Sequence, residues 1–288
     1  MSSQSFRAQA LRTVRIVLMV MVGVFFLFPL LWVVLMSFMT NVDILRSPPS
    51  PFFAPTLRNY VALISGHLST NSGDVQIDYM HNLLNSVILS VCSVVVSLIL
   101  GVPAAYAFAR YKFRGGEDMA FTLLSFRFAP PLLVLLPLLG YFQSLHLYDT
   151  YFGLVWVYQL ITLPLVLWIV RGYFEDVSED IELAYRLDGH GWLATFFKIS
   201  IPLARPGIAA AGLLSFIFAW NNFIFALILG SSAVQPVTVG ALAFITASGI
   251  EYGQIAAALV LSVIPTLVLA IFTQRYLVEG LSLGAIKG

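Results

Sequence analysis

Charge is the scarcest property of this sequence. Only 10% of its 288 residues are Asp, Glu, Lys or Arg, whereas 59% are hydrophobic. About a quarter of the residues in a soluble domain are charged, so this chain lacks the polar surface that a water-facing fold requires. Its net charge of +1 also leaves no field that would attract nucleic acid. These shortages exclude a cytosolic enzyme, a nucleic-acid-binding protein and a disordered chain, and they indicate an integral membrane protein.

Residues that carry chemistry are equally scarce. The single cysteine, Cys92, excludes a disulfide framework and any multi-cysteine metal site. The four histidines are at least 14 residues apart in the sequence and lie outside the long apolar segments, and the sequence has neither a Walker A motif nor a Gly-x-Ser-x-Gly elbow. We therefore predict no catalytic residue, no metal site and no cofactor bound by this chain.

Long apolar segments dominate what is present. A bilayer core about 30 Å thick requires about 20 apolar residues per helix. Six segments meet this requirement, namely 16–38, 83–109, 119–142, 150–170, 206–230 and 255–273. They predict an all-α fold with six transmembrane helices in one domain over 16–274, between tails 1–15 and 275–288. The first segment is too long for a cleaved signal peptide. Pro130, Pro131 and Pro137 predict a bend or an interruption in the third segment.

The positions of Lys and Arg predict the orientation of these helices. All but three of the 15 basic residues lie in the two tails and in the connections 110–118 and 171–205. Because basic residues favour the cytoplasmic side, we expect both termini and the 171–205 loop in the cytoplasm. The connection 39–81, which holds Arg46 and Arg58, is then extracytoplasmic. It is either a docking surface for an external partner or a linker.

A few polar residues at membrane depth are candidates for a solute path. Arg127 lies inside the third apolar segment, where a cation normally faces a cavity or reaches for the membrane surface. Asn221 and Asn222 follow Trp220 in the fifth segment, and Asn82 and Asn85 stand at the start of the second. These amides either join helices by hydrogen bonds or contact a hydroxylated solute, with Trp220 stacking on a sugar ring. No segment contains Asp or Glu, which weakens ion-coupled transport, so energy must come from elsewhere.

The 171–205 loop holds ten charged residues and predicts a compact structure on the cytoplasmic side. Ser178 is placed to cap a helix that begins at Glu179, and Glu182 and Arg186 are spaced as an i,i+4 pair on its water-facing side. A break at 189–191 precedes a second amphipathic helix with Trp192, Phe196 and Ile199 on one face, which Pro202 should end. A helix lying on lipid is the alternative, but the acidic bias of the loop disfavours it.

This loop resembles the EAA loop of ABC-importer permeases. Asp188-Gly189 is followed after nine residues by Ile199-Ser200-Ile201-Pro202, while Leu183-Ala184-Tyr185 replaces Glu-Ala-Ala and the nearest acid is Glu182. The resemblance implies that this loop contacts an ATPase. The residues that it assigns to coupling are Glu182, Leu183, Ala184, Arg186, Asp188, Gly189, Ile199 and Pro202.

Further segments resemble the carbohydrate branch of these permeases, the MalG type. They are Asn85-Ser86, residues 101–110, Pro130-Pro131, residues 149–154, residues 168–174, residues 218–223 and the tail 280–288. The resemblance implies a bacterial inner-membrane subunit with a second permease, two ATPases that hold ATP and Mg, and an extracytoplasmic solute-binding protein. It also places Gly284, Lys287 and Gly288 of the tail at the ATPase, although the tail is equally readable as a frayed terminus.

Four functions compete at this level. The expected one is an ATP-driven importer of a sugar or polyol, and the alternative is a permease for glycerol 3-phosphate or another anion that Arg127 would neutralise. An integral membrane enzyme would need clustered acids or histidines at membrane depth. A channel would need rings of charge or a filter loop. The six segments contain neither of these features.

Overall fold

The computed structural model describes residues 3–47, 52–70, 73–76, 78–246 and 249–284. The chain divides into two units, one made of residues 1–79 with 241–262 and the other of residues 80–240 with 263–288. Within the described residues the fold is helical apart from two short antiparallel hairpins. The prediction of an all-α membrane fold is confirmed.

The first unit joins segments from opposite ends of the sequence. Its elements are α1 (Ser3–Met36), α2 (Asn41–Ile44), α3 (Arg58–Ser65), β1 (His67–Thr70), β2 (Gly73–Gln76), η3 (Ala241–Phe244), β3 (Ile245–Thr246), β4 (Gly249–Ile250) and the start of α14 (Tyr252–Gly284). The Asn41 amide donates to the Glu251 carboxylate at 2.6 Å, and the Asn59 amide donates to the carbonyls of Ser37 and Met39. The first bond fixes the connection after α1 against the segment that precedes α14, and the other two hold α3 against the residues just after the end of α1.

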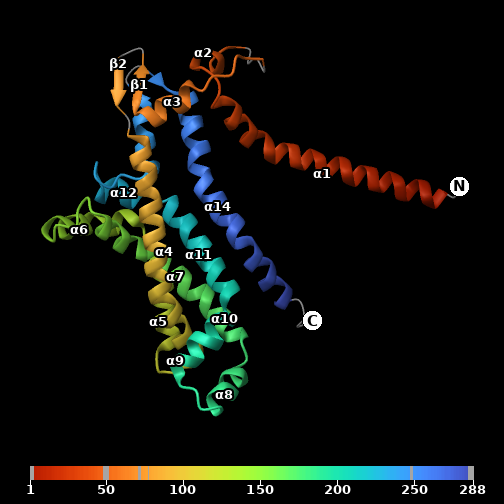
Figure 1. Ribbon diagram of the computed structural model, residues 1–288, viewed down its shortest axis with the longest axis vertical. Helices are drawn as coiled ribbons and strands as arrows, with labels where there is room; N and C mark the ends of the chain where they lie inside the picture. Colours follow the sequence, from red (N-terminus) through yellow and green to blue (C-terminus); the bar gives the residue numbers. More distant parts are fainter. Residues whose placement is uncertain (1–2, 48–51, 71–72, 77, 247–248, 285–288) are drawn as a thin grey trace. The chain divides into compact units, whose positions relative to one another are not determined.

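The second unit contains the remaining elements. They are α4 (Tyr79–Arg110), α5 (Gly116–Ser125), η1 (Phe126–Phe128), α6 (Pro131–Ser144), α7 (Tyr151–Asp176), α8 (Glu179–Leu187), α9 (Trp192–Thr195), η2 (Phe196–Ser200), α10 (Ile201–Leu203), α11 (Arg205–Trp220), α12 (Ile224–Leu229), α13 (Val237–Gly240) and the rest of α14. Figure 1 shows α7 and α11 side by side, with α8 to α10 gathered beyond their ends.

Close approach of α4, α7 and α11 forms the centre of this unit. Gly101 of α4 faces Val166 of α7, and a Cβ atom at Gly101 would stand 2.7 Å from that side chain. A Cβ atom at Gly207 of α11 would overlap the ring of Tyr173 on α7. Glycine is therefore required at both crossings, because a larger residue would force the helices apart.

The observed helices differ in length from the six predicted spans. Among the residues that the structure describes, four helices are long and apolar enough to cross a membrane, and the number rises to six if each of two bent pairs forms one span. The third predicted segment bends by 90° between Phe128 and Pro131, as its prolines predict.

The fifth predicted segment differs from the continuous helix expected over 206–230. Helix α11 ends at Trp220, and α12 begins only at Ile224. The side-chain oxygen of Asn222 accepts the backbone N–H of Phe225 at 3.3 Å, so the asparagine starts a new helix instead of continuing the old one.

Candidate functional site

Helix α8 begins and ends where its sequence predicts. The Ser178 hydroxyl accepts the backbone N–H of Asp180 at 3.3 Å, and three acidic residues occupy the first turn. Gly189, just after the helix, has a φ of 88°, a left-handed conformation that glycine adopts without strain. The chain then turns into α9 through Gly191.

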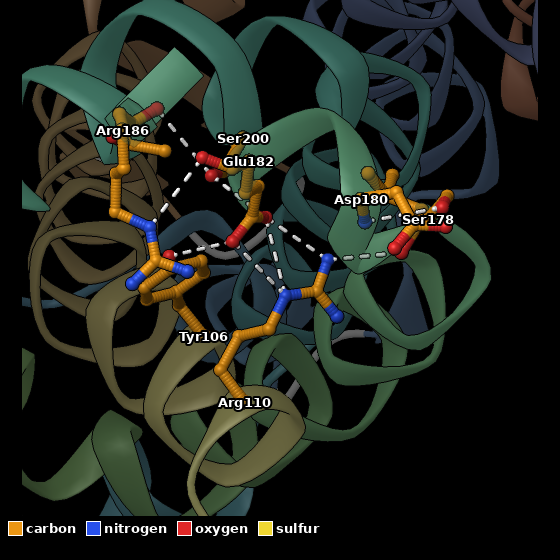
Figure 2. A network of polar contacts seen from close by, with 9 residues as sticks. Tyr106, Arg110, Ser178, Asp180, Glu182, Arg186 and Ser200 are labelled. Atoms are coloured by element: carbon orange, nitrogen blue, oxygen red, sulfur yellow. Dashed lines mark hydrogen bonds and ion pairs between the residues drawn. The ribbon is translucent and has the colours of Figure 1, made fainter. Parts of the chain in front are cut away.

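Glu182 lies on the inner side of α8, with only 1% of its surface exposed. Its carboxylate accepts hydrogen bonds from Arg110 Nη2 at 2.9 Å, from Arg110 Nε at 3.2 Å, from the Tyr106 hydroxyl at 2.8 Å and from the Ser200 hydroxyl at 2.9 Å (Figure 2). Arg110 also donates to the carbonyl of Val177 at 3.0 Å. We call these five residues the Glu182 junction. They bring together the end of α4, the end of α7, helix α8 and the segment that leads into α11.

The predicted water-facing pair of Glu182 and Arg186 is therefore wrong. The end of α4 lies beneath α8, so Arg110 takes the carboxylate of Glu182 and draws it inward. Arg186 instead donates to the backbone carbonyl of Glu182 at 3.4 Å, and its guanidinium lies 3.8 Å from the centre of the Trp192 ring. The cation–π contact connects α8 to α9.

The protonation state of Glu182 follows from its partners. Burial by itself would raise the pKa of this carboxyl, but hydrogen bonds from Arg110, Tyr106 and Ser200 favour the charged form and hold the pKa below its usual value. Glu182 is thus an ionised group at neutral pH, paired with a buried cation.

The second helix of the loop ends within one residue of the predicted position. Phe196–Ser200 form a π-helical turn, and the helix continues through Pro202 to Leu203. The chain then bends by 72° before α11 begins at Arg205, so the helix ends at the proline as predicted, to within one residue. Of the residues predicted on one face, Phe196 is buried against Tyr106, whereas Trp192 stays half exposed.

The exposed surface of α8 and α9 mixes apolar side chains with the acidic Glu179, Asp180 and Asp188. Leu187 is 88% exposed and Leu193 is 74% exposed, and Ile181 and Leu183 are also exposed. Leu183 stands where the EAA pattern has its glutamate, so this surface offers a leucine in its place. Ala184, Asp188 and Gly189 lie on or beside the same surface and are exposed. Ile199 is partly buried behind it.

Most of the residues predicted to line a solute path are buried and make contacts inside the protein. Asn85 is fully buried, donates to the carbonyls of Ala233 and Gln235, and accepts the Tyr151 hydroxyl at 2.5 Å. Asn82 is buried beside Gly240.

Two candidates at the helix breaks remain accessible. Arg127 is partly buried at the bend before α6, and its guanidinium lies 4.1 Å from the ring centre of Phe218 on α11. Among the described residues, no carboxylate is within ion-pair distance of Arg127. Asn221 is exposed at the end of α11, whereas Trp220 is buried and stacks on Phe216. A cavity of about 170 Å³ lies beside Arg127 and Phe218.

Two further predictions concern the tail and metals. Gly284 is the last residue of α14, and Lys287 and Gly288 lie outside the described residues. Across the part of the chain that the structure describes, no group of three His, Cys, Asp or Glu side chains is arranged to hold a metal.

Sequence reasoning did not assign a role to Tyr106, Arg110 or Ser200. Local sequence offers no signal for the junction, because Arg110 is one of several basic residues after an apolar segment and Glu182 has Glu179 and Arg186 one turn away on its own helix. Arg110 and Glu182 are separated by 72 residues in the sequence, and only the fold brings them together.

Comparisons with known proteins agree with this architecture. A family model described as "Binding-protein-dependent transport system inner membrane component" matches residues 97–282. A probable ABC transporter permease, y4oR of Sinorhizobium fredii, is 33% identical over 91% of each chain. The trehalose/maltose transport system permease MalG of Thermococcus litoralis is 32% identical, over 93% of this chain and 94% of the relative.

A solved structure gives the same fold. One chain in the crystal structure of a bacterial ABC transporter involved in the import of the acidic polysaccharide alginate aligns with a TM-score of 0.74. The alignment covers 96% of this chain and 99% of that chain, at 24% sequence identity. At this identity the likeness supports the fold alone.

Proposed function

The chain belongs to the family of binding-protein-dependent transport system inner membrane components, and from that premise we propose that it carries a sugar or polyol across the inner membrane for an ATP-driven importer. It is a multi-pass transport subunit and not an enzyme. A carbohydrate is favoured because the relative from Thermococcus litoralis is named for trehalose and maltose. The proposed partners are a second permease, two ATPases that hold ATP and Mg, and an extracytoplasmic solute-binding protein.

The observation that carries the proposal is the set of exposed apolar side chains on α8 and α9. Leu187 is 88% exposed and Leu193 is 74% exposed, on a loop whose acidic bias disfavours contact with lipid. An exposed apolar patch with a polar rim is typical of a protein–protein interface. We propose that the ATPase docks here and that closure of the ATPase dimer displaces α8, rocking the spans between two states. Both termini would then be cytoplasmic, with the C-terminal tail beside the ATPase.

We propose that the solute path passes the bend before α6 and the gap between α11 and α12. Discontinuous helices in transporters mark solute sites, because the broken backbone can line a cavity. Arg127 and Asn221 are the accessible polar side chains there, and Phe218 supplies an aromatic ring. The absence of a carboxylate near Arg127 among the described residues favours an anionic solute as the second candidate. On the opposite side, the 39–81 connection is the proposed docking surface for the binding protein.

The Gly189→Pro substitution tests the coupling site. Proline fixes φ near −65°, whereas Gly189 has a φ of 88°, so the turn between α8 and α9 cannot form. We expect solute uptake by whole cells to be lost, with the protein still inserted in the membrane. Gly191→Ala is the matched control, because Gly191 has a φ of −73° and open space around it. Unchanged uptake in Gly189→Pro would contradict the assignment of this loop to coupling.

A further inference from the structure

The Glu182 junction fixes α8 to the body of the second unit. We infer that the Arg110–Glu182 ion pair is the positioning element that makes α4 and the segment entering α11 move with α8 when an ATPase displaces it. The inference rests on the proposed function, since it presumes that an ATPase acts on α8. It also assigns Glu182 to an internal contact and not to the ATPase surface.

The first argument is that Glu182 has no capacity left for an external partner. A carboxylate has about four acceptor positions. Arg110 Nε, Arg110 Nη2, the Tyr106 hydroxyl and the Ser200 hydroxyl occupy them. The side chains of the ion pair are almost fully buried, with 6% of Arg110 and 2% of Glu182 exposed. An ATPase approaching the outer face of α8 could reach neither of them.

The second argument is that Glu182 is the only buried residue of α8. The Arg186–Trp192 contact and the Tyr185–His190 ring stack join α8 to the turn and helix that follow it, and not to the long helices. Helix α8 buries no apolar side chain that could fix its position by close packing, and hydrophobic burial by itself has no preferred direction. The two-pronged contact of an arginine with a carboxylate fixes distance and angle together. The ion pair therefore gives α8 its defined position against α4.

The third argument concerns how the junction reaches two helices at once. Arg110 is the last residue of α4, and Ser200 ends the π-helical turn that runs through α10 into α11. Both donate to the same carboxylate oxygen, Oε1 of Glu182. A shift of α8 is thus applied to α4 and to the start of α11 through the one carboxylate of Glu182.

The experiment measures whether α8 and α4 move together. The transporter is purified from its native membrane through a tag on this chain. In this chain Cys92→Ser removes the native cysteine, and Glu179→Cys on α8 and Ile99→Cys on α4 introduce two labelling sites. Both new cysteines replace exposed residues and carry spin labels. The distance between the labels is recorded without nucleotide and with ATP, Mg²⁺ and vanadate. With the junction intact, we expect the same narrow distance distribution in both states.

Glu182→Gln removes the charge and retains the shape of the side chain. We expect the distance distribution in this variant to broaden or shift when nucleotide is added. Asp180→Asn is the matched control, because it removes an exposed acid from the same helix and should behave like the parent. A distribution in Glu182→Gln that stays as narrow as in the parent with ATP, Mg²⁺ and vanadate would overturn the inference.

A second variant, Arg110→Lys, tests the same inference if the transporter with Glu182→Gln does not assemble. Arg110→Lys retains the positive charge and loses the two-pronged geometry. We expect an intermediate broadening on addition of nucleotide, and an unchanged distribution would again overturn the inference. Failure of the proposed function has a different signature, because no ATPase would then co-purify with the tagged chain.

Discussion

Arg110 and Arg127 both lie at the ends of apolar helices, but they differ in burial and in the groups that they contact. Arg110 is buried, paired with Glu182 and bonded to the carbonyl of Val177. Arg127 is only partly buried, lies over the Phe218 ring, and has no carboxylate near it among the described residues. A buried cation with all its partners inside the chain holds a structure together. A cation that keeps its hydrogen-bond donors available is suited to a ligand or to a changing environment.

The largest effect is expected from Arg110→Ala. Removing the cation leaves Glu182 buried and ionised without its partner, which costs about 3–5 kcal/mol of unfolding free energy. The measurement is denaturant-induced unfolding of the purified transporter in detergent. Arg114→Ala, at an exposed position four residues further on, should change the unfolding free energy by less than about 0.5 kcal/mol. Equal effects of the two substitutions would show that the Glu182 junction does not stabilise the protein.

A smaller effect is expected from Arg127→Ala. The contact with Phe218 is a cation–π interaction, and such contacts contribute about 0.5–2 kcal/mol. A double-mutant cycle with Phe218→Ala isolates this coupling energy in the same unfolding assay. If Arg127→Ala lowered the unfolding free energy as much as Arg110→Ala, Arg127 would be as important for stability as the buried, paired Arg110, and the proposed difference between the two arginines would be wrong.

The smallest effect is expected at a third arginine. Arg171 pairs with Glu175 one turn later on α7 and with Glu117 on α5, and both acids are exposed. Exposed ion pairs contribute at most about 1 kcal/mol, and pairs at i,i+4 about 0.3–0.5 kcal/mol. Glu175→Gln should therefore lower the unfolding free energy by no more than about 0.5 kcal/mol, and this small loss should vanish in high salt. A larger loss would mean that exposure does not distinguish Arg171 from Arg110.

Local sequence signals predicted local structure well. The Ser178 cap, the glycine turn after α8 and the bend at Pro130 and Pro131 depend on neighbours in the chain, so the sequence alone was sufficient to find them. The end of α11 was missed because Asn221 and Asn222 lie within a continuous apolar segment, and hydropathy does not register the hydrogen bond that starts α12.

The inward direction of Glu182 could not be predicted in this way. Spacing along one helix suggested a pair with Arg186, because i,i+4 neighbours are visible in the sequence. The actual partner, Arg110, is brought close only by the packing of α4 beneath α8. The same limit applies to Asn85, whose partners at Tyr151, Ala233 and Gln235 lie far along the chain.

The glycines at the helix crossings add a mechanical constraint. Gly101 and Gly207 leave no clearance between α7 and its two neighbours, since even one methyl group would collide with Val166 or with the Tyr173 ring. Helices in such contact can neither slide nor roll past each other unless they first separate. Helices α4, α7 and α11 then move as one rigid body. Changes in the shape of this unit are then left to the places where helices are interrupted, such as the bend before α6 and the gap between α11 and α12.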